Sequence, residues 1–240
     1  MSLFLKKNAF LAGVTALILA VPAYASVNKS VKIADGATST GASSVNGSVT
    51  VGDNATVTGD LSTVNGSIRI GESASVEAAT TVNGGLRVSK NAKTEDLETV
   101  NGTIKIADNV EVDGEVSAVN GTISLREGSS VSSSLSNVNG DITLTGSTVA
   151  KNVETVNGDV SVLNGAVVRG DLRIEKPHGW NNSSRNSKDP TITIGPGSRV
   201  EGVIYLERKV KLYISDTAEV GGVEGVMSMD DAIRFSGNRP

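Results

Sequence analysis

The sequence is organised around one tripeptide, Val-Asn-Gly, which occurs seven times. Successive copies begin 19, 18, 18, 19, 19 and 18 residues apart, at Val45, Val64, Val82, Val100, Val119, Val138 and Val156. A period this regular indicates one structural unit stacked on copies of itself. We therefore expect a solenoid in which each repeat contacts mainly its two neighbours.

Each repeat contains short alternations of apolar and polar residues, which are typical of half-buried strands. The inward positions expected for the first full repeat form three groups: Val49 with Val51, Ala55 with Val57, and Leu61 with Val64. Gly-Asp and Asn-Gly steps between the groups are typical of turns. The sequence predicts an all-β fold, a single-stranded parallel β-helix with three short strands per rung of 18–19 residues and about ten rungs.

The asparagines of the repeat are predicted to stack at one corner of the β-helix. Asn and Gly both accept positive φ, which favours a turn at Asn-Gly. Side-chain amides that stack in register can form a ladder in which each bonds the next. The predicted structural ladder comprises Asn46, Asn65, Asn83, Asn101, Asn120, Asn139 and Asn157. The alternative interpretation of this column is a row of amides that binds a glycan.

The N-terminal residues have the pattern of a secretory signal peptide. Lys6 and Lys7 precede an apolar run at 9–21, and Ala23-Tyr24-Ala25 is typical of a cleavage site. We expect residues 1–25 to be removed and Ser26 to begin the mature chain. The sequence has no cysteine, so it has no lipoprotein anchor and no disulfide, and no later run is long enough to span a bilayer. These features predict a periplasmic or extracellular protein.

Charge and composition narrow the function classes. The formal net charge of −4 becomes −6 when Lys6 and Lys7 are removed, and this acidity argues against a nucleic-acid partner. With one histidine and no cysteine, the sequence predicts no metal site, and it contains no phosphate-binding or dinucleotide-binding motif. We predict no cofactor and no enzymatic activity. Carboxylate pairs on one face, as in β-helical polysaccharide-cleaving enzymes, are the catalytic alternative.

Two segments depart from the repeat. Residues 175–190 are predicted to be a loop inserted into the β-helix domain, which we place at 26–224. The loop contains His178, Trp180 and Arg185, which are candidate contacts for a ligand or partner because loops on rigid scaffolds often carry function. The alternative is an ordinary insertion whose Trp180 packs on the wall of the helix. Residues 225–240 are predicted to cap the last rung or to form a partner-binding tail.

The corner sequences Val57-Thr58-Gly59-Asp60-Leu61 and Val168-Arg169-Gly170-Asp171-Leu172 resemble the valine-x-glycine-aspartate-hydrophobic corners of bactofilins. The resemblance extends over most of residues 27–224. It implies a right-handed β-helix that assembles end to end into filaments without nucleotide. Bactofilins are cytoplasmic and lack a signal peptide, and their Asn-Gly column is less regular. The chain looks more similar to exported β-helical proteins of proteobacteria.

These observations lead to two functional hypotheses. The first is a non-enzymatic structural scaffold or interaction protein of the bacterial cell envelope that self-associates end to end. Its partners would be further copies of itself, or a glycan or protein of the envelope. The second is a carbohydrate-binding or carbohydrate-modifying protein that uses the loop around Trp180.

Overall fold

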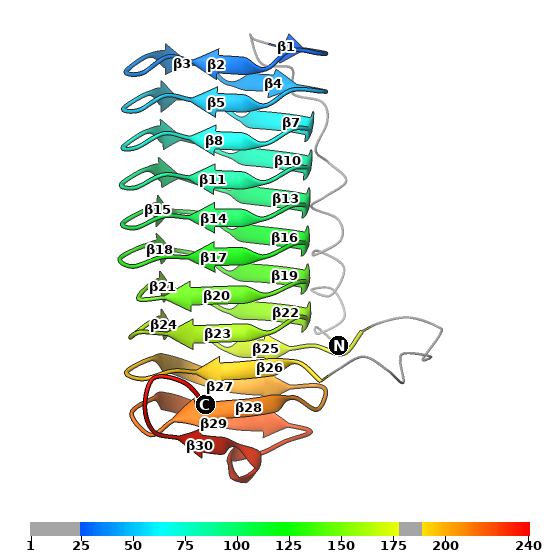
Figure 1. Ribbon diagram of the computed structural model, residues 1–240, viewed down its shortest axis with the longest axis vertical. Helices are drawn as coiled ribbons and strands as arrows, with labels where there is room; N and C mark the ends of the chain where they lie inside the picture. The colour runs from blue at the N-terminus through cyan, green and yellow to red at the C-terminus, as the bar shows by residue number, and fades with distance from the viewer. Residues whose placement is uncertain (1–24, 178–188) are drawn as a thin grey trace, which may run out of the picture.

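The computed structural model describes residues 25–177 and 189–240, and shows a rod of stacked β-strands (Figure 1). The described residues contain thirty strands and one short 3-10 helix, η2 (Met229–Asp231). The strands form an 11-stranded and a 19-stranded sheet, and all the strand pairs between rungs are parallel. The predicted parallel β-helix of about ten rungs is confirmed.

The 11-stranded sheet contributes one strand to each rung and forms the front of the rod in Figure 1. Its strands pair in sequence order, each with the next. They are β2 (Val31–Ile33), β5 (Val49–Val51), β8 (Ile68–Ile70), β11 (Leu86–Val88), β14 (Ile104–Ile106), β17 (Ile123–Leu125), β20 (Ile142–Thr145), β23 (Val160–Leu163), β26 (Thr191–Ile194), β28 (Lys211–Ser215) and β30 (Ile233–Phe235).

The 19-stranded sheet supplies the other two sides of each rung. One of these two sides of the sheet includes the two-residue strands β3 (Thr38–Ser39), β6 (Thr56–Val57), β9 (Ser75–Val76), β12 (Lys93–Thr94), β15 (Glu111–Val112), β18 (Ser130–Val131), β21 (Thr148–Val149) and β24 (Val167–Val168). The remaining strands of the sheet are β1 (Ala25–Ser26), β4 (Ala42–Ser44), β7 (Leu61–Asn65), β10 (Ala79–Asn83), β13 (Leu97–Asn101), β16 (Val116–Asn120), β19 (Leu135–Asn139), β22 (Val153–Asn157), β25 (Leu172–Ile174), and the longer β27 (Arg199–Leu206) and β29 (Glu219–Gly225), which each span both sides.

The core is a narrow column of aliphatic side chains, because each residue lies beside its counterpart in the next rung. Leu86 of β11 pairs with Ile68 on one side and with Ile104 on the other, and all three are almost fully buried. The same register places Val112 beside Val131 and Leu97 beside Val116. Branched aliphatic residues suit such a pleated, tightly stacked surface.

The prediction that Val64 points inward is wrong. Strand β7 is five residues long, and its alternation from the buried Leu61 places Thr63 inside and Val64 on the outer face. The interior accepts Thr63 because its hydroxyl donates to the carbonyl oxygen of Gly47 at 2.7 Å. Thr81 and Thr99 repeat this contact in the next two rungs, donating to glycine carbonyls at 2.9 Å. A buried hydroxyl is tolerated when it is hydrogen-bonded.

The glycine of Val-Asn-Gly is required by close packing between rungs rather than by a positive φ at asparagine. None of the ladder asparagines has positive φ, and those from Asn65 onward each end a strand. A Cβ atom on Gly102 would collide with the carbonyl oxygen of Gly84, and one on Gly84 would collide with that of Gly66. The corners of neighbouring rungs therefore stack backbone on backbone, a contact that only glycine permits.

We predict that Ile104→Asp destabilises the protein by roughly 4 kcal/mol or more, because it buries an unpaired charge between two rungs. Ile104 is fully buried, between Leu86 and Ile123. The matched control is Ser124→Asp, an outward position on the next strand, which should cost less than about 1 kcal/mol. Urea unfolding followed by circular dichroism measures both; equal losses would contradict the assigned inward column.

Candidate functional site

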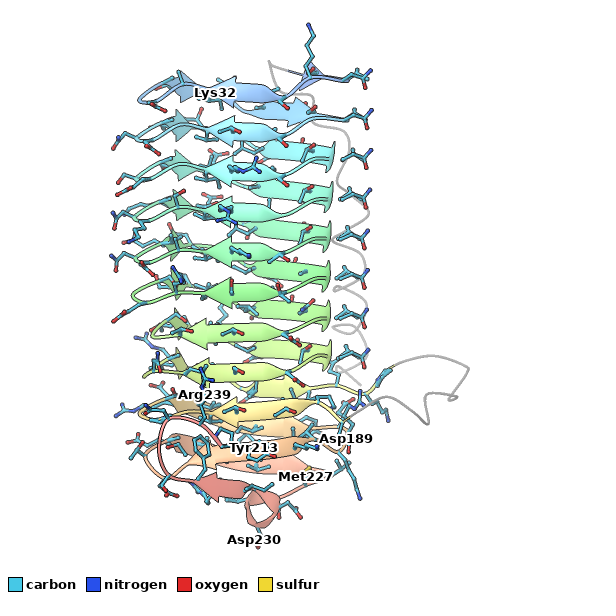
Figure 2. The ribbon with its side chains drawn as sticks, in the orientation of Figure 1. Lys32, Asp189, Tyr213, Met227, Asp230 and Arg239 are labelled. Atoms are coloured by element: carbon cyan, nitrogen blue, oxygen red, sulfur yellow. The ribbon has the colours of Figure 1, made fainter. Side chains whose placement is uncertain are left out.

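The asparagines of the repeat form a continuous chain of side-chain hydrogen bonds along one edge of the rod (Figure 2). Each Nδ2 donates to the Oδ1 of the asparagine one rung earlier, at distances between 2.8 and 3.0 Å. The donors are Asn46, Asn65, Asn83, Asn101, Asn120, Asn139 and Asn157. The first acceptor is Asn28, which lies in the degenerate first rung. All seven residues named from the sequence thus join in one ladder.

The ladder lies on the surface rather than in the core. The asparagines from Asn28 to Asn139 are exposed, and Asn157 is partly buried. A primary amide carries two N–H donors, and the ladder uses one of them. The second donor of each amide in the exposed stretch faces away from the stack. The edge therefore presents a row of donors at the rung spacing of about 4.8 Å.

Arg208 ends the ladder and fixes its direction. Its Nη1 donates to Oδ1 of Asn157 at 3.0 Å, from a position 51 residues later in the chain. A guanidinium has donors only, so Asn157 must present its oxygen to Arg208 and its Nδ2 to Asn139. All the remaining amides of the ladder then take the same direction, and the aligned hydrogen bonds polarise one another. The positive charge lies at the carbonyl end of this aligned row, where it is stabilising.

The sequence did not indicate the contact of Arg208 with the ladder. Asn157 and the backbone of Arg208 are separated by two rungs, because Thr155 pairs with Ile174 and Ile174 pairs with Leu206. By the same register, Glu175, Lys176 and Pro177 stand where the next Val-Asn-Gly would be expected. His178, Trp180 and Arg185, the candidate contacts of that loop, lie outside the described residues.

A group of carboxylates lies on the outer face of the 19-stranded sheet. Burial raises the pKa of Glu98, and the nearby carboxylates of Asp96 and Glu115 raise it further. The pKa of Glu115 is raised mainly by burial and by Asp96 and Glu154, although a hydrogen bond from the Ser136 hydroxyl at 3.2 Å opposes this. At neutral pH, the negative charges of these neighbouring carboxylates therefore repel one another.

Corner carboxylates, including Asp96 of this group, also bond the backbone of the next rung. Oδ1 of Asp53 accepts from the backbone N–H of Glu72 at 2.7 Å, and Oδ1 of Asp96 accepts in the same way from Glu115 at 2.7 Å. Residues 25–177 and 189–240 contain no group of three or more acidic or histidine side chains arranged to hold a metal ion. The hydrogen bonds of Asp53 and Asp96 connect each corner to the next rung.

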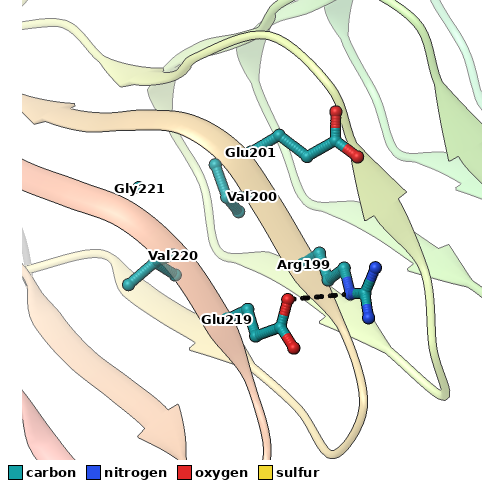
Figure 3. A pocket seen from close by; sticks show the side chains of 6 residues that line it. All are labelled: Arg199, Val200, Glu201, Glu219, Val220 and Gly221. Atoms are coloured by element: carbon teal, nitrogen blue, oxygen red, sulfur yellow. Dashed lines mark ion pairs between the residues drawn. The ribbon is translucent and has the colours of Figure 1, made fainter.

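A shallow, open hollow lies between β27 and β29, where the pairing register shifts between Val200 and Val203 (Figure 3). Its walls carry Arg199, Glu201 and Glu219, and the Arg199 Nε lies 3.1 Å from a Glu219 carboxylate oxygen. The Arg199 guanidinium in the hollow is therefore already paired with a carboxylate. The remaining charge in the hollow is the Glu201 carboxylate.

Comparisons with known proteins identify no relative: no protein-family model, no curated protein and no solved structure matches the chain. Within the described residues, none of the helical structure has the length and apolar character needed to cross a membrane.

We predict that Asn101→Ala destabilises the protein more than Asn28→Ala does. The first change removes two ladder bonds, to Asn83 and from Asn120, whereas the second removes one. At about 0.5–1.5 kcal/mol per bond, the expected losses are about 1–3 kcal/mol for Asn101→Ala and about 0.5–1.5 kcal/mol for Asn28→Ala. Chemical denaturation measures both variants; equal and negligible losses would mean that the amides contribute as a simple turn.

Asn101→Asp should be destabilising at neutral pH and less so in acid. An ionised carboxylate cannot donate to Asn83 Oδ1 and is repelled by it, so the folded state raises the pKa of the new carboxyl. Stability relative to wild type should therefore rise as pH falls through that raised pKa. Denaturation of Asn101→Asp and Asn101→Ala at pH 7 and pH 4 tests this, since the alanine variant should show no additional pH dependence.

The raised pKa values of Glu98 and Glu115 predict a second effect of pH on stability. Because the pKa values of Glu98 and Glu115 are raised in the folded state, the free energy of unfolding falls as pH rises from the ordinary value of 4.5 through the raised values. The double variant Glu98→Gln/Glu115→Gln should flatten this part of the pH profile. Glu72→Gln/Glu224→Gln, at exposed positions, is the charge-matched control and should keep the wild-type slope. An unchanged slope in both variants would contradict the assignment.

Proposed function

We propose that this protein is a non-enzymatic structural scaffold of the bacterial cell envelope that associates end to end. The signal-peptide pattern in residues 1–25 supports export, and the bactofilin-like corners support assembly. The observation that carries the proposal is the state of the two ends of the rod. The strands at each end have the geometry of an inner rung but a partner on one side only.

At the N-terminal end, β2 pairs only with β5 and β3 only with β6 among the described residues. At the C-terminal end, β29 pairs only with β27 and β30 only with β28. Unpaired strand edges are templates for pairing with another chain. Because one end differs from the other, copies would join head to tail, and such contacts generate open filaments unless the rotation between copies closes a ring.

The C-terminal end is partly covered. Met227, Met229 and Ala232 pack against the core, and the Val210 N–H lies 3.4 Å from the Met227 sulfur. Ile233 remains half exposed, and Val220 and Val223 are partly buried. Thioether side chains adapt to irregular surfaces. This end therefore provides an adaptable apolar surface on which the first rung of another copy can pack.

Lys32 offers a sharp test of the N-terminal edge. Val31 donates its N–H to Ser48 and Ile33 accepts from Gly52, so both face β5. The intervening Lys32 then directs its backbone N–H toward the open edge, because bonding alternates along a parallel strand. Lys32→Pro removes that donor without breaking a bond inside the rod. Lys32→Thr is the matched control for charge, since Thr50 occupies this position in the next strand.

The mature chain beginning at Ser26 should form rods whose length grows with protein concentration. A single copy spans about 48 Å, from eleven strands about 4.8 Å apart. Light scattering and negative-stain microscopy should show assembly of wild type and Lys32→Thr, and single rods for Lys32→Pro. A wild-type chain that stays monomeric at all concentrations, or assembly of Lys32→Pro equal to wild type, would refute end-to-end association.

A further inference from the structure

Three cations stack in register on the flat face of the 11-stranded sheet. Arg69 is the central residue of β8, Arg87 of β11 and Lys105 of β14, and each lies directly beside the next. All three side chains are exposed, while the residues on either side of each are buried. We call these three residues the basic strip. Lys32 stands in the same column two strands before Arg69, with Thr50 between them.

Such stacking contrasts with the pairing of charges elsewhere on the rod. Lys93 pairs in register with Glu111, and their side chains meet at 2.6 Å; Arg199 and Glu219 do the same at 3.1 Å. Like charges on directly adjacent strand positions are destabilising. Within the described residues, the three side chains of the basic strip make no ion pair or hydrogen bond. Within the described residues, no ion pair offsets the repulsion between these three cations.

The residues that flank the basic strip have small side chains or none, and several of them carry hydrogen-bonding groups. The preceding outward positions are Ser67, Gly85 and Thr103, and beyond them runs the asparagine ladder with its second N–H donors. On the other side, Gly71, Ser89 and Ala107 separate the strip from the turn. The charged residues Glu72, Lys90 and Asp108 follow next in the chain, and Asp108 is paired with Lys90 at 3.3 Å.

We propose that the basic strip, together with the exposed amides beside it, binds a linear acidic polysaccharide that runs along the rod axis. The strip presents one cation per rung, at intervals of about 4.8 Å, and so matches an extended chain with repeating carboxylates. The amide and hydroxyl donors alongside suit sugar hydroxyls. Together they recognise both the charge and the hydroxyl groups of one polymer.

The same surface fits other polyanions poorly. Proteins that hold single-stranded nucleic acid use aromatic side chains on which bases stack, and the strands of the strip have none. A membrane surface favours a wide basic area with apolar anchors, whereas the strip is one residue wide on a polar face. The inference goes beyond the proposed scaffold role and does not require self-association, so each can fail without the other.

The test is titration of the mature chain with polygalacturonate, a linear uronate polymer, by isothermal titration calorimetry. Wild type should bind, with affinity that falls as salt rises with a log–log slope of about −2 for three neutralised cations. Neutral dextran should not bind. The triple variant Arg69→Ser/Arg87→Ser/Lys105→Ser should lose at least tenfold in affinity. Serine is tolerated in this column, because Ser124 stands there on β17.

The matched control removes three cations away from the strip, at Lys93, Lys151 and Arg199, by substitution with serine. It changes the net charge equally and should keep wild-type affinity. Circular dichroism checks the folding of both variants. Absence of wild-type binding, or equal loss in both triple variants, would overturn the proposal.

Two further measurements distinguish other molecules that could bind to the strip. Tighter binding of linear polyphosphate than of polygalacturonate would assign the strip to phosphate polymers and overturn the polysaccharide assignment. Loss of self-association in the strip variant, without polygalacturonate binding by wild type, would show that the strip contacts a second copy of the chain. That outcome would also overturn the proposal.

Discussion

The structure depends on parallel pairing of each rung with the next at a shift of one repeat. Backbone hydrogen bonds hold neighbouring rungs about 4.8 Å apart, and this distance brings every residue into contact with its counterpart. The consequence is that favourable or unfavourable contacts repeat along a column. Leucine and isoleucine stack into the core, amide stacks on amide, and glycine stacks on glycine where a Cβ would collide with a carbonyl oxygen.

The asparagine ladder and the basic strip show two outcomes of the same constraint. An amide is both donor and acceptor, so a column of identical amides satisfies itself and needs a partner only at its ends. Arg208 supplies that partner at Asn157. A cation has no such complementarity with another cation, so within the described residues the column of Arg69, Arg87 and Lys105 does not balance its own charge.

Sequence reasoning predicted the features that repeat. The spacing of Val-Asn-Gly gave the rung length, and alternation gave the buried positions such as Val49 and Ile104. It failed where a polar residue occupies an inward position, as Thr63 does, because the hydroxyl is satisfied by a carbonyl of another rung. It missed Arg208, whose contact with Asn157 depends on two rungs and an intervening insertion. The cations of the basic strip were visible in the sequence, as the central residues between paired Ile, Leu or Val.

The central claim, that each residue lies beside its counterpart one repeat away, is tested most directly by native-state backbone amide hydrogen exchange resolved by residue. The account predicts maxima of protection at the strands, recurring every 18–19 residues from about residue 31 to about residue 174, then after a step of 32 residues and one of 20, with fast exchange at the turns and at the outer edge of β2. Protection confined to one contiguous block, or without that period, would contradict the stacked-rung structure.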